Sequence, residues 1–327
     1  MDGKFVEVSN LKKYFHVGKR QILKAVDDVS FSIERGSTLG LVGESGCGKT
    51  TVGRHLCRIY EPDEGAIRID GRDISHISQR QCRELAKKVQ MIFQDPYASL
   101  NSFFTVGEII GEAFTIHKMF RSVKERRDRI RELLEIVGLS AEHANRFPHE
   151  FSGGQRQRIG IARALALSPE LIVCDEAISA LDVSIQAQIV NMLIEFQRTM
   201  NLTYLFIAHD LSMVRHIADD TAVMYLGALV EYGATDAVYG HPAHPYTKGL
   251  LSAVPTPDPV YERSHRRIVM EGEVSDPINP EPGCRFYARC REAEKLCGEV
   301  APPLKKIGGN HMVACHACKE KEGERST

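Results

Sequence analysis

The fold of this chain is decided by one stretch, Gly43-Glu44-Ser45-Gly46-Cys47-Gly48-Lys49-Thr50. It fits the pattern G-x-x-x-x-G-K-[ST] and lies between a β-rich run at residues 38–42 and a helical pattern from about Lys49, the context that this motif requires. Backbone N–H groups of such a loop close around phosphates, Lys49 neutralises the β and γ groups, and the Thr50 hydroxyl ligates Mg²⁺. The candidate nucleotide contacts are Gly43, Ser45, Gly46, Cys47, Gly48, Lys49, Thr50 and the next residue, Thr51.

Strands and helices alternate outward from this loop. Residues 5–8 and 29–33 are β-rich, residues 171–174 and 203–207 are apolar runs, and an amphipathic helical pattern near 184–200 separates these two runs. Such alternation is typical of a parallel sheet that gathers its ligand contacts at the carboxyl ends of the strands. The sequence therefore predicts an α/β fold of the P-loop NTPase class with a parallel-sheet core.

A helical block is predicted from about residue 95 to 164. Within it, residues 124–137 place Ile130, Leu133, Leu134 and Val137 on one helix face. The Lys/Arg/Glu run of this helix is interpreted as a solvated face and not as a nucleic-acid patch. The net charge also gives no indication of a nucleic-acid partner, because 42 Lys and Arg nearly balance 43 Asp and Glu.

Two adjacent carboxylates follow the apolar run at 171–174. In a parallel sheet, Asp175 and Glu176 come to the strand end near the phosphate loop. We expect Asp175 to hold Mg²⁺ through its water shell and Glu176 to polarise the attacking water as general base. The alternative, a solvated acidic turn, is disfavoured by the phosphate loop upstream.

Three more side chains are candidates for the same site. Gln94 ends a hydrophobic run, and its amide is a candidate contact for Mg²⁺ or for the attacking water. His209 ends the run at 205–208 and is a candidate contact for the γ-phosphate, although a lone histidine at a strand end is usually structural. Phe15 is a candidate for stacking on adenine, with core packing as its competitor and Tyr14 as a substitute.

A second anion site is predicted in Phe151-Ser152-Gly153-Gly154-Gln155. Its candidate contacts are a serine hydroxyl, bare glycine N–H groups and the positive end of a helix beginning at Gln155, through Ser152, Gly153, Gly154 and Gln155. The chain already has one phosphate loop. The economical explanation is that this segment serves a nucleotide held by another subunit.

The segment Ser179-Ala180-Leu181-Asp182 follows the catalytic pair closely enough to share its edge of the sheet. Asp182 is therefore a candidate nucleotide-site residue with a role in communication between subunits. A helix N-cap is the alternative, and the two roles are compatible.

Length and composition set the frame for these motifs. With 327 residues and 43% hydrophobic content, the chain can bury a large core and an appendage. Its N-terminus lacks the basic and apolar regions of a signal peptide, and no apolar run approaches the roughly 20 residues that span a bilayer. We expect a cytoplasmic or peripheral protein.

Five of the nine cysteines lie in the tail, after a Pro- and His-rich segment that begins near Tyr239. We place a domain boundary there. The setting of Cys284, Cys290, Cys297 and Cys315 indicates a four-thiolate metal site. The gaps between the first three suit a larger cluster at least as well as a single Zn²⁺, while the Cys315/Cys318 pair keeps zinc open. His311 and His316 are alternative ligands in place of a thiolate, but we expect them at the surface.

Taken together, GESGCGKT, Gln94, FSGGQ, LIVCDE, SALD and His209 resemble the ATP-binding subunits of ABC transporters. The resemblance implies a head-to-tail dimer, in which each ATP lies between one subunit's phosphate loop and the other's Ser-Gly-Gly segment. It also implies a helical subdomain that docks on a membrane permease and is hinged near Gln94. Phe151 replaces the usual Leu, and Ala177-Ile178 stands where Pro-Thr often follows Glu176, but neither change removes a reacting group.

The tail is similar to the C-terminal extension of the oligopeptide/dipeptide and nickel branch of ABC importer ATPases, some of which carry a [4Fe-4S] cluster. That resemblance implies cluster ligands at Cys284, Cys290, Cys297 and Cys315, with Cys318 as a spare. The expected domains are an ABC nucleotide-binding domain at 1–240, with its helical subdomain at about 95–164, and a small Cys-rich C-terminal extension at 241–327.

The leading hypothesis is an ATP-hydrolysing subunit of a peptide importer at the cytoplasmic face of the membrane. The expected partners are a sister ABC ATPase, favoured over a second copy of this chain, two integral-membrane permease subunits and an extracytoplasmic solute-binding protein, with no nucleic acid. A soluble ABC ATPase that clamps a macromolecule is the alternative. A duplicated nucleotide domain or a large zinc module would favour it, and this chain has neither. The cargo stays open among dipeptides, oligopeptides, nickel chelates and other small solutes.

Overall fold

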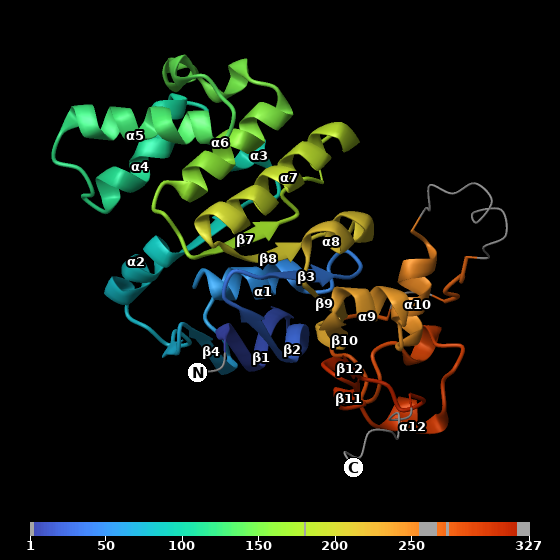
Figure 1. Ribbon diagram of the computed structural model, residues 1–327. Coiled ribbons are helices and arrows are strands. Elements are labelled where there is room, and N and C mark those ends of the chain that lie inside the picture. The colour runs from blue at the N-terminus through green and yellow to red at the C-terminus, as the bar shows by residue number, and fades with distance from the viewer. Residues whose placement is uncertain (1–2, 180, 255–266, 273–274, 319–327) are drawn as a thin grey trace, which may run out of the picture.

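Two β-sheets form the frame of the molecule, whose computed structural model describes residues 3–179, 181–254, 267–272 and 275–318 (Figure 1). Within these residues the larger sheet has the strands β3 (Thr38–Val42), β6 (Val89–Ile92), β7 (Leu171–Asp175), β8 (Thr203–Ile207), β9 (Asp220–Tyr225), β10 (Ala228–Ala234), β11 (Lys305–Gly308) and β12 (His311–Val313). Their order is β11-β12-β10-β9-β3-β8-β7-β6. From β9 to β6 the strands are parallel, whereas β10, β12 and β11 are antiparallel. The predicted α/β fold with a mainly parallel core is confirmed.

A smaller antiparallel sheet covers one side of the nucleotide domain. It contains β1 (Lys4–Gly18), β2 (Gln21–Glu34), β4 (Glu64–Ile69) and β5 (Arg72–Asp73) in the order β2-β1-β4-β5. The β-rich runs at 5–8 and 29–33 are the centres of β1 and β2, which are much longer than those runs. Both strands contain irregular register positions, so a simple two-residue alternation describes them poorly.

Alternating residues of the central strands enter two separate cores. Along β7, Leu171 and Val173 pack into the core shared with the smaller sheet, while Ile172 and Cys174 pack into the core shared with the helices. Because both faces of the parallel sheet are covered, its strands are continuous apolar runs. This burial fixes the register that brings the following residues, Asp175 and Glu176, to the carboxyl edge.

The helices cover the large sheet, and α3 to α7 form the upper part of the molecule in Figure 1. Their bounds are α1 (Lys49–Leu56), α2 (Gln79–Lys88), α3 (Pro96–Ser99), α4 (Val106–Ile116), α5 (Val123–Ile136), η1 (Ala141–Asn145), η2 (Pro148–Glu150), α6 (Gly153–Leu165), α7 (Val183–Met200), α8 (Leu211–Ile217), α9 (Thr235–Gly240), α10 (Pro245–Ser252), η3 (Tyr287–Arg289) and α12 (Lys295–Glu299). Between β6 and β7, α3 to α6 form a compact helical region, with Ile130, Leu133 and Leu134 of α5 turned into its core.

The C-terminal extension returns to the large sheet. Strand β12 pairs with β10 in antiparallel register, Glu231 with Val313 and Tyr232 with Met312. Figure 1 shows this orange and red part of the chain below β10 and α9. The composition break near residue 240 is therefore not a break in the sheet, because the chain beyond it adds two strands to the edge.

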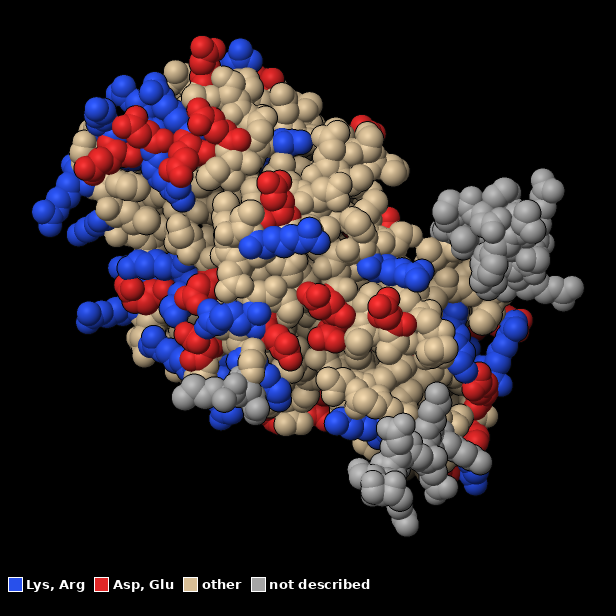
Figure 2. Space-filling view, in the orientation of Figure 1, with Lys and Arg blue, Asp and Glu red and all other residues tan. Residues whose placement is uncertain are grey.

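Charges of both signs are mixed over the face of the molecule shown in Figure 2. They are densest over the helical region, where the outer residues of α5 are exposed. This mixture matches the expected solvated helix face. Among the described helices, none combines the length and the apolar character needed to cross a bilayer.

Candidate active site

The phosphate loop connects the buried strand β3 to α1, and its glycines take conformations that other residues rarely adopt. Gly43, Gly46 and Gly48 have φ values of 150°, 77° and 105°. A Cβ on Gly48 would lie 2.0 Å from the Ala25 carbonyl oxygen, whereas a Cβ on Gly46 would meet no atom within 4 Å. The loop is thus closed on the protein side and open at Gly46, as an anion cradle requires.

Lys49 lies inside this loop, with only 4% of its surface exposed. Its ammonium donates hydrogen bonds to the carbonyl oxygens of Gly43, at 2.8 Å, and Glu44, at 2.9 Å. Both acceptors are neutral dipoles, so they orient the cation without cancelling its charge. A cation held in this way is prepared to bind phosphate oxygens.

Thr50 and Asp175 face each other across the edge of the sheet. The Thr50 hydroxyl donates to Asp175 Oδ1 at 2.7 Å. Burial raises the pKa of Asp175, and the hydrogen bond from Thr50 opposes this shift. A hydroxyl and a carboxylate are the oxygen ligands that Mg²⁺ prefers, and a divalent cation would offset the cost of burying the carboxylate. The pair therefore fits a Mg²⁺ site.

Glu176, Gln94 and His209 meet at the ends of three neighbouring strands. The Gln94 amide donates to Glu176 Oε2 at 2.6 Å, and His209 Nδ1 lies 3.9 Å from the same oxygen. A small hollow of about 50 Å³ beside them is lined by Glu176, Ile178, Ser179, Gln186, Ala208, His209 and Asp210. The neutral Gln94 amide thus orients the Glu176 carboxylate, which borders a hollow large enough for a water molecule.

The Ser-Gly-Gly segment forms the start of α6. This helix begins at Gly153, two residues before the predicted start, because Ser152 is its N-cap. The Ser152 hydroxyl accepts from the Gln155 N–H at 3.4 Å, while the Gln155 side chain accepts from the Ser152 N–H at 3.1 Å. Within the described residues, no hydrogen bond or ion pair joins 152–155 to the phosphate loop. The exposed serine and the helix N-terminus do not serve this chain's own loop here.

Asp182 stands at the N-cap position of α7, but its carboxylate makes no capping hydrogen bond and is exposed. Of the SALD segment, Ala180 lies outside the described residues.

Phe15 is partly exposed and packs edge-on against Tyr60, with ring centres 5.6 Å apart. The Tyr14 hydroxyl is bonded to Asp27, which makes Tyr14 a poorer substitute for stacking on adenine. The carbonyl oxygen of Thr51 lies 2.6 Å from His55 Nδ1.

Cys47 is packed under the loop and 2% exposed. Burial raises the pKa of its thiol, and the nearby Lys49 ammonium only partly opposes the shift. Because the thiolate is the reactive form, both properties make this cysteine a poor target for alkylation.

The tail cysteines lie in one neighbourhood without forming a closed metal site. Burial, together with the thiols of Cys290, Cys297 and Cys315, raises the pKa of Cys284 to about 11. No three His, Cys, Asp or Glu side chains of the described residues are close enough to hold a metal ion. The donor chemistry fits an iron–sulfur cluster or zinc, but the arrangement of the side chains does not.

One expectation about the tail is wrong. His311 is buried, not at the surface, and its Nε2 lies 2.7 Å from Glu231 Oε1. Glu231, which is fully buried in β10, also accepts the N–H groups of Ala243 and His244 at 2.8 Å each. The Glu231 carboxylate thus connects the extension to the sheet. No local sequence pattern predicted these contacts.

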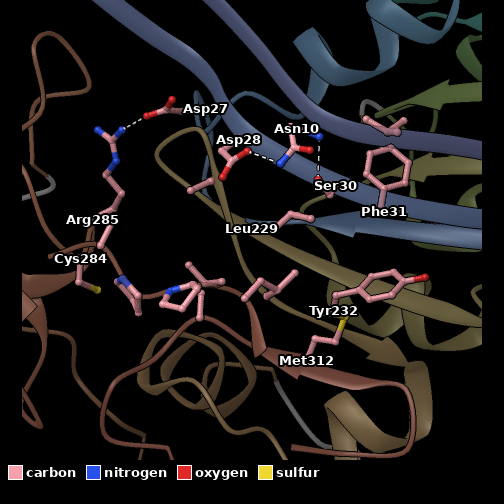
Figure 3. A pocket seen from close by; sticks show the side chains of 18 of the residues that line it. Asn10, Asp27, Asp28, Ser30, Phe31, Leu229, Tyr232, Cys284, Arg285 and Met312 are labelled. Carbon is pink, nitrogen blue, oxygen red and sulfur yellow. Dashed lines mark hydrogen bonds and ion pairs between the residues drawn. The ribbon is translucent and has the colours of Figure 1, made fainter. Parts of the chain in front are cut away.

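A cavity of about 900 Å³ lies away from the phosphate loop (Figure 3). Residues of β1, β2, β10 and the extension line it, and the phosphate loop contributes no lining residue. Two pairs of its polar side chains are bonded to each other: Arg285 pairs with Asp27, and Asn10 donates to Asp28 at 2.8 Å. This larger space therefore shares no lining residue with the phosphate loop or with the strand-end hollow.

The phosphate loop, the Asp-Glu strand end and the second glycine segment together define a P-loop ATPase of the ABC type. The model of the ABC transporter family matches residues 26–179, and that of the oligopeptide/dipeptide transporter C-terminal region matches residues 230–297. The chain belongs to the oligopeptide/dipeptide branch of the ABC transporter ATPases.

Two relatives from Bacillus subtilis illustrate the match. The putative oligopeptide transport ATP-binding protein YkfD is 53% identical over 317 residues, which are 97% of this chain and 96% of YkfD. The oligopeptide transport ATP-binding protein OppF is 54% identical over 303 residues, 90% of this chain and 98% of OppF. Among solved structures, a dimeric post-hydrolysis state of the ATP-binding cassette MJ0796, bound to ADP and Pi, is 27% identical with a TM-score of 0.64. It covers 70% of this chain and 98% of that chain.

Proposed function

We propose that this chain is the ATP-hydrolysing subunit that powers an ABC importer of oligopeptides. The observation that carries the proposal is a strand-end site with Lys49, Thr50, Asp175 and Glu176 in place, on a chain that matches oligopeptide transport ATP-binding proteins over 90% to 97% of its length. We assign residues 1–240 to the nucleotide-binding domain, about 95–164 to its helical subdomain and 241–327 to the extension.

In this mechanism the residues of the strand-end site divide the binding of the nucleotide and the activation of water among them. The glycine-rich loop and Lys49 bind the phosphates, assisted by Ser45 and Thr51, and Phe15 stacks on the adenine. Thr50, Asp175 and Gln94 would hold Mg²⁺, which would neutralise negative charge on the phosphates. Glu176 accepts a proton from the attacking water, Gln94 orients its carboxylate, and His209 contacts the γ-phosphate.

The second half of each site comes from a sister ATPase. Ser152 to Gln155 carry a serine hydroxyl, glycine N–H groups and a helix N-terminus, and among the described residues no hydrogen bond or ion pair joins them to this chain's own loop. Such a set binds an anion, and the partner's nucleotide is the anion that a head-to-tail dimer supplies. Asp182 is exposed at the same edge and takes part in the contact between subunits. The dimeric assembly of the cassette MJ0796 supports this arrangement.

Exposed apolar side chains support docking of the helical region on membrane permeases. Phe103 is 86% exposed, Tyr97 63%, Ile116 62% and Val123 75%. All four lie in or next to α3, α4 and α5, and large exposed apolar residues gathered in one region are typical of an interaction site. This surface would hold the chain at the cytoplasmic face of the membrane, in a system that includes two permease subunits and an extracytoplasmic binding protein.

Replacing Phe103 by Asp should weaken permease docking while the isolated ATPase keeps its fold, because the side chain is almost fully exposed. We expect loss of co-purification with the permeases and loss of ATP-driven uptake of a tetrapeptide in proteoliposomes. Val17→Asp is a matched control, since Val17 is also exposed but lies on β1. Normal assembly and uptake with Phe103→Asp would contradict the docking surface.

Co-purification tests the proposed function as a whole. The tagged chain should bring down integral permeases, and the reconstituted assembly should import peptide in an ATP-dependent manner. Recovery with nucleic acid or a soluble macromolecular complex, and without permeases, would favour the soluble ABC ATPase instead.

For the extension, we propose that Cys284, Cys290, Cys297 and Cys315 bind a [4Fe-4S] cluster with a structural role. The four thiols lie in one neighbourhood, which supports this, but they would have to draw closer together to hold a metal, since no three of the described side chains are close enough here. After anaerobic purification we expect a brown protein that contains iron and acid-labile sulfide. Stoichiometric zinc without iron would refute the cluster.

A further inference from the structure

The C-terminal extension reaches the phosphate loop directly. The Tyr246 hydroxyl, from α10, accepts the Glu44 N–H at 2.9 Å. Arg289, at the end of η3, donates from Nη1 to both carboxylate oxygens of Glu44, each at 3.1 Å. Tyr246 is fully buried, and the Arg289 side chain is 9% exposed. Both contacts end on the second residue of the loop.

Glu44 also contacts Lys49, the lysine that binds phosphate. Its carbonyl oxygen accepts from Lys49 Nζ at 2.9 Å and from the Cys47 N–H at 3.3 Å. One residue thus bonds through its side chain and N–H to the extension, and through its carbonyl to the cation that binds phosphate. A shift of Glu44 would therefore move one of the hydrogen-bond acceptors that position Lys49 Nζ.

Arg289 is itself held firmly. It donates to the Tyr225 hydroxyl at 3.3 Å, and its guanidinium lies 5.9 Å from the ring centre of Phe286. Tyr225, Tyr246 and Phe286 pack together, with ring centres 4.7 to 5.5 Å apart. This aromatic cluster joins a strand of the ATPase to two parts of the extension, so the guanidinium has a fixed place only when the extension is folded.

The charge of Glu44 explains why the loop needs such a contact. A carboxylate next to Gly43 repels the phosphates that the loop must bind, and the repulsion is strong because the site is partly shielded from water. The Arg289 guanidinium, which donates to both carboxylate oxygens at 3.1 Å, neutralises that carboxylate and fixes its position. Lys49 can then act on the nucleotide alone.

We propose that Arg289 and Tyr246 are positioning residues for ATP binding, through which the extension neutralises and fixes Glu44 in the phosphate loop. The inference rests on the ATPase activity of the proposed function and adds a second task to the extension. ATP affinity should therefore depend on a part of the chain more than two hundred residues away from the loop, as the separation of 245 residues between Glu44 and Arg289 shows.

The test uses the full-length chain assembled with its sister ATPase, with ATP binding measured by calorimetry and turnover measured separately. Arg289→Gln should raise the Kd and KM for ATP about fivefold and leave kcat nearly unchanged. Adding Glu44→Gln should rescue binding to within about twofold of the wild type, because the unpaired carboxylate is then gone. A merely structural role of Arg289 would not be rescued in this way.

Arg285→Gln is the matched control. Arg285 also belongs to the extension and forms an ion pair with the ATPase, but its partner is Asp27 of β2 and not the loop (Figure 3). We expect its ATP affinity to stay within about twofold of the wild type. An equal loss in Arg285→Gln and Arg289→Gln, or a double variant as weak as Arg289→Gln alone, would overturn the proposal.

Tyr246→Phe keeps the test decisive if Arg289→Gln does not fold, because it removes one oxygen atom from a buried ring. It leaves the Glu44 N–H without its acceptor, and we expect ATP affinity to fall about threefold. Unchanged affinity in a folded Tyr246→Phe chain would overturn the proposal. The proposed function fails separately: a wild-type chain that binds no ATP contradicts it, whereas normal ATP binding without peptide uptake leaves the role of Arg289 standing.

Discussion

Glu176→Gln should nearly abolish ATP hydrolysis and leave ATP binding intact. Glutamine keeps the shape of the side chain and a carbonyl oxygen beside Gln94 and His209, but it cannot accept the proton of the attacking water. We expect kcat to fall by about 10²- to 10⁴-fold, the usual contribution of a general base. Steady-state turnover and calorimetric ATP binding on the assembled transporter measure the two effects separately.

Glu170→Gln is the control for this experiment. Glu170 directly precedes β7, at the opposite end of the strand from Glu176, and forms surface ion pairs with Arg35 and Lys88. It should turn over ATP normally. Normal turnover in Glu176→Gln itself would remove this residue from the role of general base.

Gly154→Asp should block hydrolysis at the nucleotide of the sister ATPase. A Cβ at this position would lie 2.7 Å from the Ile185 Cγ2 atom, and the new carboxylate would repel the approaching phosphate. We expect hydrolysis at the sister's nucleotide to fall by at least about 100-fold, as when a developing anion loses its donors. ATP binding to this chain's own loop should be unaffected.

The measurement is ADP trapping with orthovanadate in the two-subunit assembly, using a photoreactive ATP that labels the subunit whose loop holds it. Label should disappear from the sister chain. Ser152→Ala provides a milder variant, and Ser122→Ala is its control, since Ser122 also caps a helix, α5, in the helical region. If Gly154→Asp instead abolished ATP binding to its own chain, the signature would not be the partner's half of the site.

The strand-end site could be predicted from the sequence because its parts are local motifs. The phosphate loop, Asp175-Glu176 and His209 each follow an apolar run, and apolar runs of a parallel sheet end at one edge. The start of α6 at Gly153 could also have been predicted from the sequence. Ser152-x-x-Gln155 is a capping box, which predicts Ser152 as the N-cap and Gly153 as the first helical residue.

What the sequence did not predict depends on contacts between distant residues. The Arg289–Glu44 and His311–Glu231 pairs span 245 and 80 residues, and each needs the extension to fold back on the sheet. Strands as short as β11 and β12 carry little periodicity of their own, because the strands they pair with define them more than their sequences do. Tertiary packing decides such features.

A structure of the Glu176→Gln transporter with Mg²⁺ and ATP tests the central claim most directly. We predict that the γ-phosphate on Lys49 lies within about 3 Å of the signature serine hydroxyl of the sister ATPase, and that Ser152 makes the same contact with the sister's nucleotide. A structure in which each nucleotide is enclosed by one chain alone, with Ser152 facing solvent, would contradict the shared site.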